Sequence, residues 1–301
     1  MGVITNIASD NIASALKAGY NIKALLIQPT KEGITDTVYK IIDKEETTYL
    51  LKIYESVDEN IVQEEIQLVN ELYKNGFPVP SVYPVTTKQF CHQVGIDERP
   101  ACLFRFLSGE SPVIIKPHHI KEIARFLADF HTYTDGRNDY ISNNYTTDQI
   151  KYNLAFSDQS DTNTYDEIFD SIDDQEEHGI IHGDLFPDNV FFQNDRLSGV
   201  FDFAASCRGS FQFDLAVVAV SWCFTDDRFD NSLFELLIDS YSQRFQSVEI
   251  IEKQLFNWMK FACLYYASQR LFMQKINRDS SINHRPAEEY FKKLERLSDS
   301  Y

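Results

Sequence analysis

The 301-residue sequence has few cysteines, and none of them form a pair with metal-ligand spacing. Its five cysteines include no C-x-x-C pair, which argues against structural zinc, and their odd number and wide spacing argue against a disulfide framework. The N-terminus lacks both a basic region and an apolar region, so it predicts no signal peptide. The densest apolar run, Leu215 to Val220, is far too short to cross a membrane. We therefore expect a cytoplasmic protein.

Positive charge is also scarce. The chain has 28 Lys and Arg residues against 46 Asp and Glu residues, for a formal net charge of −18. Such a surface repels phosphate backbones and anionic lipids, so neither nucleic acid nor a membrane is expected as a partner. The charge suits cationic or amine-bearing ligands weakly, and solubility explains it equally well.

Two common catalytic motifs are missing. No G-x-x-x-x-G-K-[ST] segment exists, which excludes a P-loop enzyme. No G-x-S-x-G elbow exists, which excludes the usual nucleophile of an α/β-hydrolase.

The pattern of apolar residues divides the chain into a strand-rich part and a helical part. Up to the connector at Phe106–Gly109 the periodicity is mainly that of strands, and beyond it mainly that of helices. This order predicts an α+β fold with a small N-terminal lobe, residues 1–107, a larger helical lobe, residues 108–301, and a ligand cleft between them. The expected strands are 24–27, 37–42, 48–54, 82–86 and 101–106. One helix is expected to begin at Asp58, and the other expected helices are 117–133, 164–177, 213–224, 230–245 and 250–274.

The most informative stretch is IIHGDLFPDNVFF, followed by LSGVFDFAAS. An apolar strand leads into a loop that carries Asp184, and Asn189 follows five residues later. A second expected strand, Leu197 to Phe201, ends in Asp202. Two carboxylates and an amide at the ends of adjacent strands suit Mg²⁺, and phosphoryl transfer needs a metal, positioning and a carboxylate for the hydroxyl proton. The alternative is a turn with polar caps.

These residues resemble the aminoglycoside phosphotransferase superfamily, which is similar to protein kinases in fold. In that superfamily H-G-D-x-x-x-x-N is the catalytic loop, and a strand-end aspartate follows it. The resemblance implies that Asp184 is the catalytic base, that Asn189 and Asp202 bind Mg²⁺, and that His182 braces the loop. It also implies that Asp214, which opens the helix at F-D-L-A, is buried beneath the loop as a prop.

The same resemblance implies an ATP site in the N-terminal lobe. The segment Glu32 to Tyr39, with Gly33, resembles the turn that covers the phosphates, although Asp36 stands where many relatives carry a neutral residue. Lys52 on the third strand would pair with Glu65 on the following helix. The backbone of Arg105 to Leu107 would contact adenine. Two alternatives stay open: Lys52 is a solubilising edge-strand lysine, or Glu64 replaces Glu65 as its partner.

The acceptor is expected to be small. A protein kinase has an activation segment that ends in A-P-E, whereas here Asp214 follows Asp202 after a short loop and A-P-E is absent. The stretch from His182 to Phe203 most resembles the bacterial homoserine kinases of the phosphotransferase type. A homoserine carboxylate would need a cation, for which Arg208 and Arg270 are the candidates. Aminoglycosides, choline, other amino alcohols or sugars are alternative acceptors, and a nucleotide-binding pseudokinase is the remote alternative.

Overall fold

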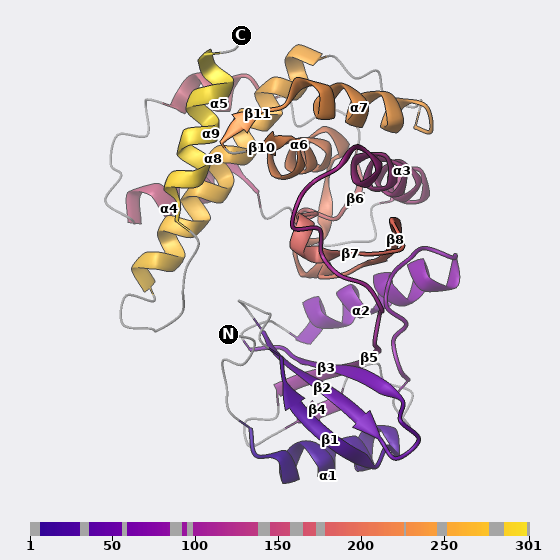
Figure 1. The fold of residues 1–301 in the computed structure, drawn as a ribbon. Helices are drawn as coiled ribbons and strands as arrows, with labels where there is room; N and C mark the ends of the chain where they lie inside the picture. The colour runs from indigo at the N-terminus through magenta and orange to yellow at the C-terminus, as the bar shows by residue number, and fades with distance from the viewer. Residues whose placement is uncertain are drawn as a thin grey trace. The chain divides into compact units, whose positions relative to one another are not determined.

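The computed structural model describes residues 7–30, 36–55, 59–84, 92–94, 99–137, 145–156, 165–172, 178–225, 227–245, 252–276 and 286–299. The chain forms two compact units, shown in Figure 1. Unit 1 comprises Met1–Gly109 together with Ser198–Ala204, and unit 2 comprises Glu110–Leu197 and Ala205–Tyr301. The segment Ser198–Ala204, which the sequence division at 107/108 assigned to the second lobe, therefore packs with unit 1.

A five-stranded antiparallel sheet organises unit 1, in the order β1-β2-β3-β5-β4 (Figure 1). The alternation of apolar and polar residues that predicted the strands is the alternation of the two faces of a pleated sheet. The strands are β1 Ala24–Pro29, β2 Thr37–Asp43, β3 Thr48–Ile53, β4 His92–Val94 and β5 Arg99–Arg105. Val82, expected to start a strand, forms a single bridge with Phe104, and residues 85–86 lie outside the described residues.

The core of unit 1 lies between the sheet and helix α1 (Ser9–Tyr20), which the sequence analysis did not predict. Helix α1 lies along the sheet in Figure 1. Its apolar side chains Ile12 and Leu16 recur one turn apart and belong to the same core cluster as Leu51 and Ile53. Because neighbouring residues of a strand point to opposite faces, Lys52 projects from the other face of β3.

On that other face Lys52 reaches a side chain of helix α2 (Glu59–Lys74). This helix was predicted to begin at Asp58, which lies outside the described residues. The two faces of the sheet therefore differ: one packs the apolar core against α1, and the other carries the charged side chain of Lys52.

Unit 2 is mainly helical, as the sequence predicted. The expected helices 117–133, 213–224, 230–245 and 250–274 correspond to α3, α6, α7 and α8, whereas only α5 forms among the described residues of the expected helix 164–177. Helices α4 and α9 complete the set. The bounds are α3 Pro117–Thr134, α4 Thr147–Phe156, α5 Asp166–Asp170, α6 Phe211–Trp222, α7 Asn231–Ser242, α8 Glu252–Ile276 and α9 Glu288–Asp299.

Helix α6 forms the centre of unit 2. Every residue from Phe211 to Val220 is buried, which explains why its sequence is apolar all round rather than amphipathic. Ser210 caps its start by accepting a hydrogen bond from the amide of Gln212. Helix α8 packs against α6, α4 and α9. In the part of the chain that the structure describes, none of the helices has the length and apolar character that a membrane crossing requires.

Short strand pairs accompany these helices, and one of them leads into unit 1, to which Ser198–Ala204 belong. β6 (His178–Ile181) pairs with β9 (Cys207–Ser210), β7 (Val190–Gln193) with β8 (Arg196–Val200), and β10 (Phe224–Thr225) with β11 (Arg228–Phe229). The strands that precede Asp184 and Asp202 were expected from the sequence to be adjacent. That expectation is wrong, because those strands, β6 and β8, have different partners.

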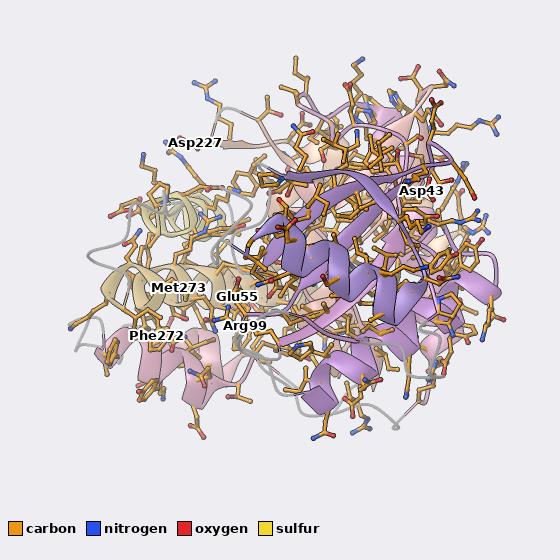
Figure 2. The ribbon with its side chains drawn as sticks, turned by 90° about the horizontal axis from the view of Figure 1, so that it is seen from below. Asp43, Glu55, Arg99, Asp227, Phe272 and Met273 are labelled. Atoms are coloured by element: carbon orange, nitrogen blue, oxygen red, sulfur yellow. The ribbon has the colours of Figure 1, made fainter. Side chains whose placement is uncertain are left out.

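The end of β3 is tied to the sheet by a carboxylate. Glu55, the second residue after β3, forms an ion pair with Arg99 at the start of β5, and the two side chains lie together in Figure 2. Glu55 also accepts a hydrogen bond from the hydroxyl of Thr37 on β2. These contacts fix the chain just beyond Lys52.

The turn from β2 to β3 depends on Asp43, which is labelled in Figure 2. Its carboxylate accepts hydrogen bonds from the amides of Glu45 and Thr47, at 2.9 and 2.8 Å, and from the hydroxyl of Tyr49 at 3.0 Å. Burial, together with the Asp43 carboxylate, raises the pKa of Tyr49 to about 12. One side chain thus satisfies three donors at the turn.

We expect Asp43→Ala to lower the free energy of unfolding by about 1–3 kcal/mol, because Tyr49 and the turn lose their acceptor. Urea unfolding followed by circular dichroism measures this. Glu45→Ala is the matched control, since it removes an exposed carboxylate from the same turn and should change stability by less than about 0.5 kcal/mol. Equal stability of the two variants would show that Asp43 does not hold the turn.

Candidate active site

The loop that follows β6 carries the H-G-D-x-x-x-x-N residues, and its backbone needs a glycine. Gly183 has a φ of +74°, in the left-handed region that side chains disfavour. A Cβ at this position would lie 2.7 Å from the carbonyl oxygen of Ala205. The loop can therefore approach the chain after Asp202 only with glycine at position 183.

A buried aspartate beneath the loop fixes its main chain. The two carboxylate oxygens of Asp214, in the first turn of α6, accept hydrogen bonds from the amides of His182 and Gly183 at 2.8 and 2.9 Å. Asp214 is fully buried, as the sequence predicted for a prop under the loop. These two bonds satisfy consecutive amides that have no strand partner.

A histidine completes the shell of Asp214. Nε2 of His131 on α3 lies 3.1 Å from the carboxylate, and its Nδ1 lies 2.7 Å from the hydroxyl of Tyr241 on α7. Burial alone would raise the pKa of Asp214, but the hydrogen bond and charge of His131 and the amide of His182 outweigh it, and the pKa lies below its ordinary value. Burial lowers the pKa of His131.

Asp184 and Asn189 are held to each other. The amide nitrogen Nδ2 of Asn189, at the end of the 3₁₀ turn Pro187–Asn189, donates to the backbone oxygen of Asp184 at 2.8 Å and to its carboxylate at 2.9 Å. Nδ1 of the buried His182 accepts from the amide of Asp184 at 3.2 Å. The pair of side chains is thereby oriented by the loop itself.

Two aromatic side chains that the sequence analysis did not select also bind this loop. The indole of Trp222 donates to the carbonyl of Leu185 at 2.8 Å, and the hydroxyl of Tyr266 on α8 donates to the carbonyl of Gly183. A buried aromatic residue in a helix gives no sequence signal that separates packing from a bond to a distant carbonyl.

Tyr265, the neighbour of Tyr266, lies in the electrostatic range of the catalytic loop. Burial raises the pKa of its hydroxyl, and the nearby carboxylate of Asp184 raises it further. Helix α8 therefore supplies two adjacent tyrosines to the region of Asp184.

In unit 1, three carboxylates surround one lysine. Nζ of Lys52 lies 3.2 Å from carboxylate oxygens of Glu65, Asp202 and Asp36. The carboxylate that meets Lys52 from α2 is thus that of Glu65, the partner the sequence favoured over Glu64. Asp36 was noted in the sequence only as an unusual acidic residue near the predicted phosphate turn.

The three carboxylates stabilise the charge of Lys52 and disfavour one another's charge. Burial alone would lower the pKa of Lys52, but the three carboxylates outweigh it and hold that pKa above its ordinary value. Burial raises the pKa of Asp36 and of Glu65, and Lys52 opposes the rise. Asp202, the second residue after β8, has a φ of +67°, a conformation that aspartate tolerates better than most residues.

The remaining predicted nucleotide residues are less constrained by the structure. Gly33 lies outside the described residues. The amide of Arg105 donates to the carbonyl of Ser81, and the amide of Phe106 donates to that of Thr48. Since these two amides are engaged, the prediction of a backbone contact with adenine falls on Leu107.

The two arginines predicted for an acceptor carboxylate have different surroundings. Arg208 is exposed on β9, opposite Ile180 of β6. Arg270 forms an ion pair with Glu289 of α9 at 2.7 Å, donates to the carbonyl of Pro286 and stacks on the ring of Tyr290. Arg270 therefore docks α9 on α8.

Among the described residues, no three His, Cys, Asp or Glu side chains are grouped closely enough to hold a metal ion by themselves.

Known structures share this fold. The amicoumacin kinase hAmiN, solved with AMP-PNP, Ca²⁺ and Ami, superposes with a TM-score of 0.75 at 13% identity, covering 97% of this chain and 92% of that one. A microcompartment-associated aminopropanol kinase gives a TM-score of 0.71 at 14% identity, covering 97% and 94%. The fold is α+β and protein-kinase-like, with the small antiparallel sheet in unit 1 and the helices in unit 2.

Sequence comparison identifies the family within that fold. Residues 26–246 match the phosphotransferase enzyme family. A homoserine kinase of Sinorhizobium medicae is 30% identical over 240 residues, 75% of this chain and 72% of that protein. A homoserine kinase of Parvibaculum lavamentivorans is 29% identical over 272 residues, 81% and 79% of the two chains. The chain belongs to the phosphotransferase enzyme family.

We expect Asp214→Ala to lower the free energy of unfolding by about 3–5 kcal/mol, because it leaves the amides of His182 and Gly183 and the ring of His131 without their buried partner. Urea unfolding at pH 7 measures the loss. Asp239→Ala removes an exposed carboxylate from α7 and should be nearly neutral.

The pH dependence gives a second readout of the same contact. A carboxyl whose pKa is lowered by folding contributes stability above its unfolded pKa of about 3.9 and loses it as the pH falls below that value. The stability difference between wild type and Asp214→Ala should therefore shrink below about pH 4. A constant difference from pH 7 to pH 3 would contradict an ionised Asp214.

Proposed function

We propose that this phosphotransferase is a magnesium-dependent kinase that transfers the γ-phosphoryl group of ATP to the hydroxyl of L-homoserine. The observation that carries the reaction type is the catalytic loop, in which Asp184 and Asn189 bind each other on a backbone fixed by Asp214. The identity of about 30% with homoserine kinases supports the choice of acceptor.

The donor side of the proposal rests on unit 1. Lys52 would bind phosphate oxygens, Glu65 would orient it, and Leu107 and the turn at Gly33 would contact adenine and the phosphates. The amicoumacin kinase with the same fold was solved with AMP-PNP and Ca²⁺. Lys52 offers such a ligand a cation that is only 14% exposed, and the phosphates would compete with its carboxylate partners for it.

The residues proposed for Mg²⁺ are Asn189 and Asp202. Both hydrogen bonds from the Asn189 side chain to Asp184 use Nδ2, so neither of them occupies the amide oxygen, the atom a hard cation binds. Mg²⁺ keeps several waters and is held by one or two protein oxygens plus substrate phosphates. The cation would neutralise charge on the phosphates during transfer.

Asp184 is proposed as the group that orients the acceptor hydroxyl and accepts its proton. Its carboxylate already accepts one hydrogen bond from Asn189, which fixes its direction. The oxygen of the substrate would then attack the γ-phosphorus while ADP leaves. Most of the catalytic effect in such reactions comes from positioning and electrostatics, which suits a loop whose backbone is held by Asp214, Trp222 and Tyr266.

For the acceptor carboxylate, Arg208 is the better of the two candidates. It is exposed on β9, the strand paired with the one that leads into the catalytic loop. Arg270 is engaged with Glu289 and Pro286, so an acceptor could bind it only by displacing α9 contacts. A guanidinium binds a carboxylate through two parallel hydrogen bonds.

We expect Asp184→Asn to lower kcat by about 10²–10⁴-fold, because the amide cannot accept the hydroxyl proton. Steady-state kinetics with ADP release as the signal measures it, and circular dichroism establishes folding. Asp188→Asn is the matched control: it makes the same chemical change at an exposed position of the same loop and should retain kcat. A folded Asp184→Asn enzyme with wild-type kcat would remove Asp184 from the mechanism.

We expect kcat/KM for L-homoserine to exceed that for an aminoglycoside by about tenfold or more, because the site needs to match one hydroxyl, one ammonium and one carboxylate. A panel of amino acids, amino alcohols, sugars and aminoglycosides, assayed with Mg²⁺ and ATP, measures this.

The panel also separates the alternatives. Preference for an amino alcohol or an aminoglycoside would replace the acceptor and leave the kinase assignment in place. Absence of magnesium-dependent turnover with every acceptor would favour the nucleotide-binding pseudokinase. Arg208→Lys should raise KM for L-homoserine and leave KM for an amino alcohol unchanged, since only the former has a carboxylate.

A further inference from the structure

The ammonium of Lys52 is already engaged by three carboxylates: it donates hydrogen bonds to Glu65 and Asp202 and forms an ion pair with Asp36. A lysine ammonium carries three N–H donors. Three carboxylate oxygens, from Glu65, Asp202 and Asp36, each lie 3.2 Å from its nitrogen. A phosphate oxygen that binds Lys52 therefore has to compete with these carboxylates.

The cluster also has an excess of negative charge. One lysine faces three carboxylates, and the side chains of Lys52, Asp36 and Glu65 are only 14%, 7% and 6% exposed. Burial raises the pKa of Asp36, which reflects how poorly this position tolerates its charge. An anionic triphosphate would meet this excess charge as well as an occupied lysine.

Asp36 is the carboxylate best placed to be exchanged. Glu65 is fixed in the middle of the 16-residue helix α2, and Asp202 is proposed above for Mg²⁺. Asp36 directly precedes β2, and its Oδ1 accepts a hydrogen bond from the amide of Glu55 at 3.2 Å, the one hydrogen bond to this carboxylate besides the Lys52 contact among the described residues. It also follows the segment with Gly33 that the sequence predicts to cover the phosphates.

We propose that Asp36 is an internal competitor for the triphosphate, which occupies the place of a phosphate oxygen on Lys52 and lowers the affinity of the protein for nucleotide. This inference rests on the proposed function, in which Lys52 binds the phosphates of ATP. It assigns Asp36 a role in setting how tightly the donor binds, separate from the acceptor chemistry at Asp184.

The test is isothermal titration calorimetry of AMP-PNP with Mg²⁺ against wild type and Asp36→Asn. The asparagine keeps an oxygen for the amide of Glu55 but removes the charge from Lys52, so the fold should persist. We expect Asp36→Asn to bind AMP-PNP about tenfold tighter or more, because a charged competitor has been removed. Adenosine, which lacks phosphates, should bind both proteins equally.

Controls separate this effect from net charge and from folding. Glu45→Gln removes one negative charge from an exposed turn of the same sheet and should leave the affinity for AMP-PNP unchanged. Asp36→Ser is a second variant with a short acceptor for Glu55, and it should bind tighter as well if Asp36→Asn does not fold.

The outcomes distinguish the inference from the proposed function. Equal affinity of wild type and variant overturns the role of Asp36, and weaker binding overturns it in favour of Asp36 as a ligand of the cation. If wild type binds no AMP-PNP while Asp36→Asn does, competition is supported in its strongest form. If neither folded protein binds AMP-PNP, both the donor assignment and the inference fail.

Discussion

One buried carboxylate, that of Asp214, holds the loop of unit 2 that carries Asp184 and Asn189. Its oxygens bind two successive loop amides, and its contact with His131 links the loop to α3 and, through Tyr241, to α7. A loop held this way can carry glycine in a left-handed conformation and still have one geometry. Trp222 and Tyr266 satisfy two of its carbonyls, so the loop is bonded through side chains of α6 and α8.

In unit 1 the corresponding group is a cation, the ammonium of Lys52, which is largely buried and yet has to stay available to a ligand. Helix α1 covers the apolar face of the sheet, and Lys52 lies on the opposite face. The carboxylates on that face hold the ammonium of Lys52 in place. A lysine that is strongly held is also one that exchanges partners at a cost. The third carboxylate, Asp36, makes that exchange part of nucleotide binding and gives the chain a means of setting its affinity for the donor.

The sequence predicted the fold class and selected several of these residues because the catalytic loop is a local motif with fixed spacing. Lys52 and Glu65 were found for the same reason, as residues of a strand and of the helix that follows it. Helix α1 was missed because its apolar residues precede any recognisable motif. The contacts of Asp36, Trp222 and Tyr266 join positions far apart in the sequence, and no local pattern encodes them. The placement of Ser198–Ala204 in unit 1 is a tertiary property of the same kind.

The central claim is that the γ-phosphoryl group of ATP ends on the hydroxyl oxygen of L-homoserine. Phosphorus NMR of the purified protein with Mg²⁺, ATP and L-homoserine tests this directly, because a phosphomonoester on a CH₂ group gives a resonance split by its two neighbouring protons. The account predicts this resonance together with ADP in equal amounts. Formation of ADP with only inorganic phosphate, or an unchanged ATP spectrum, would contradict it.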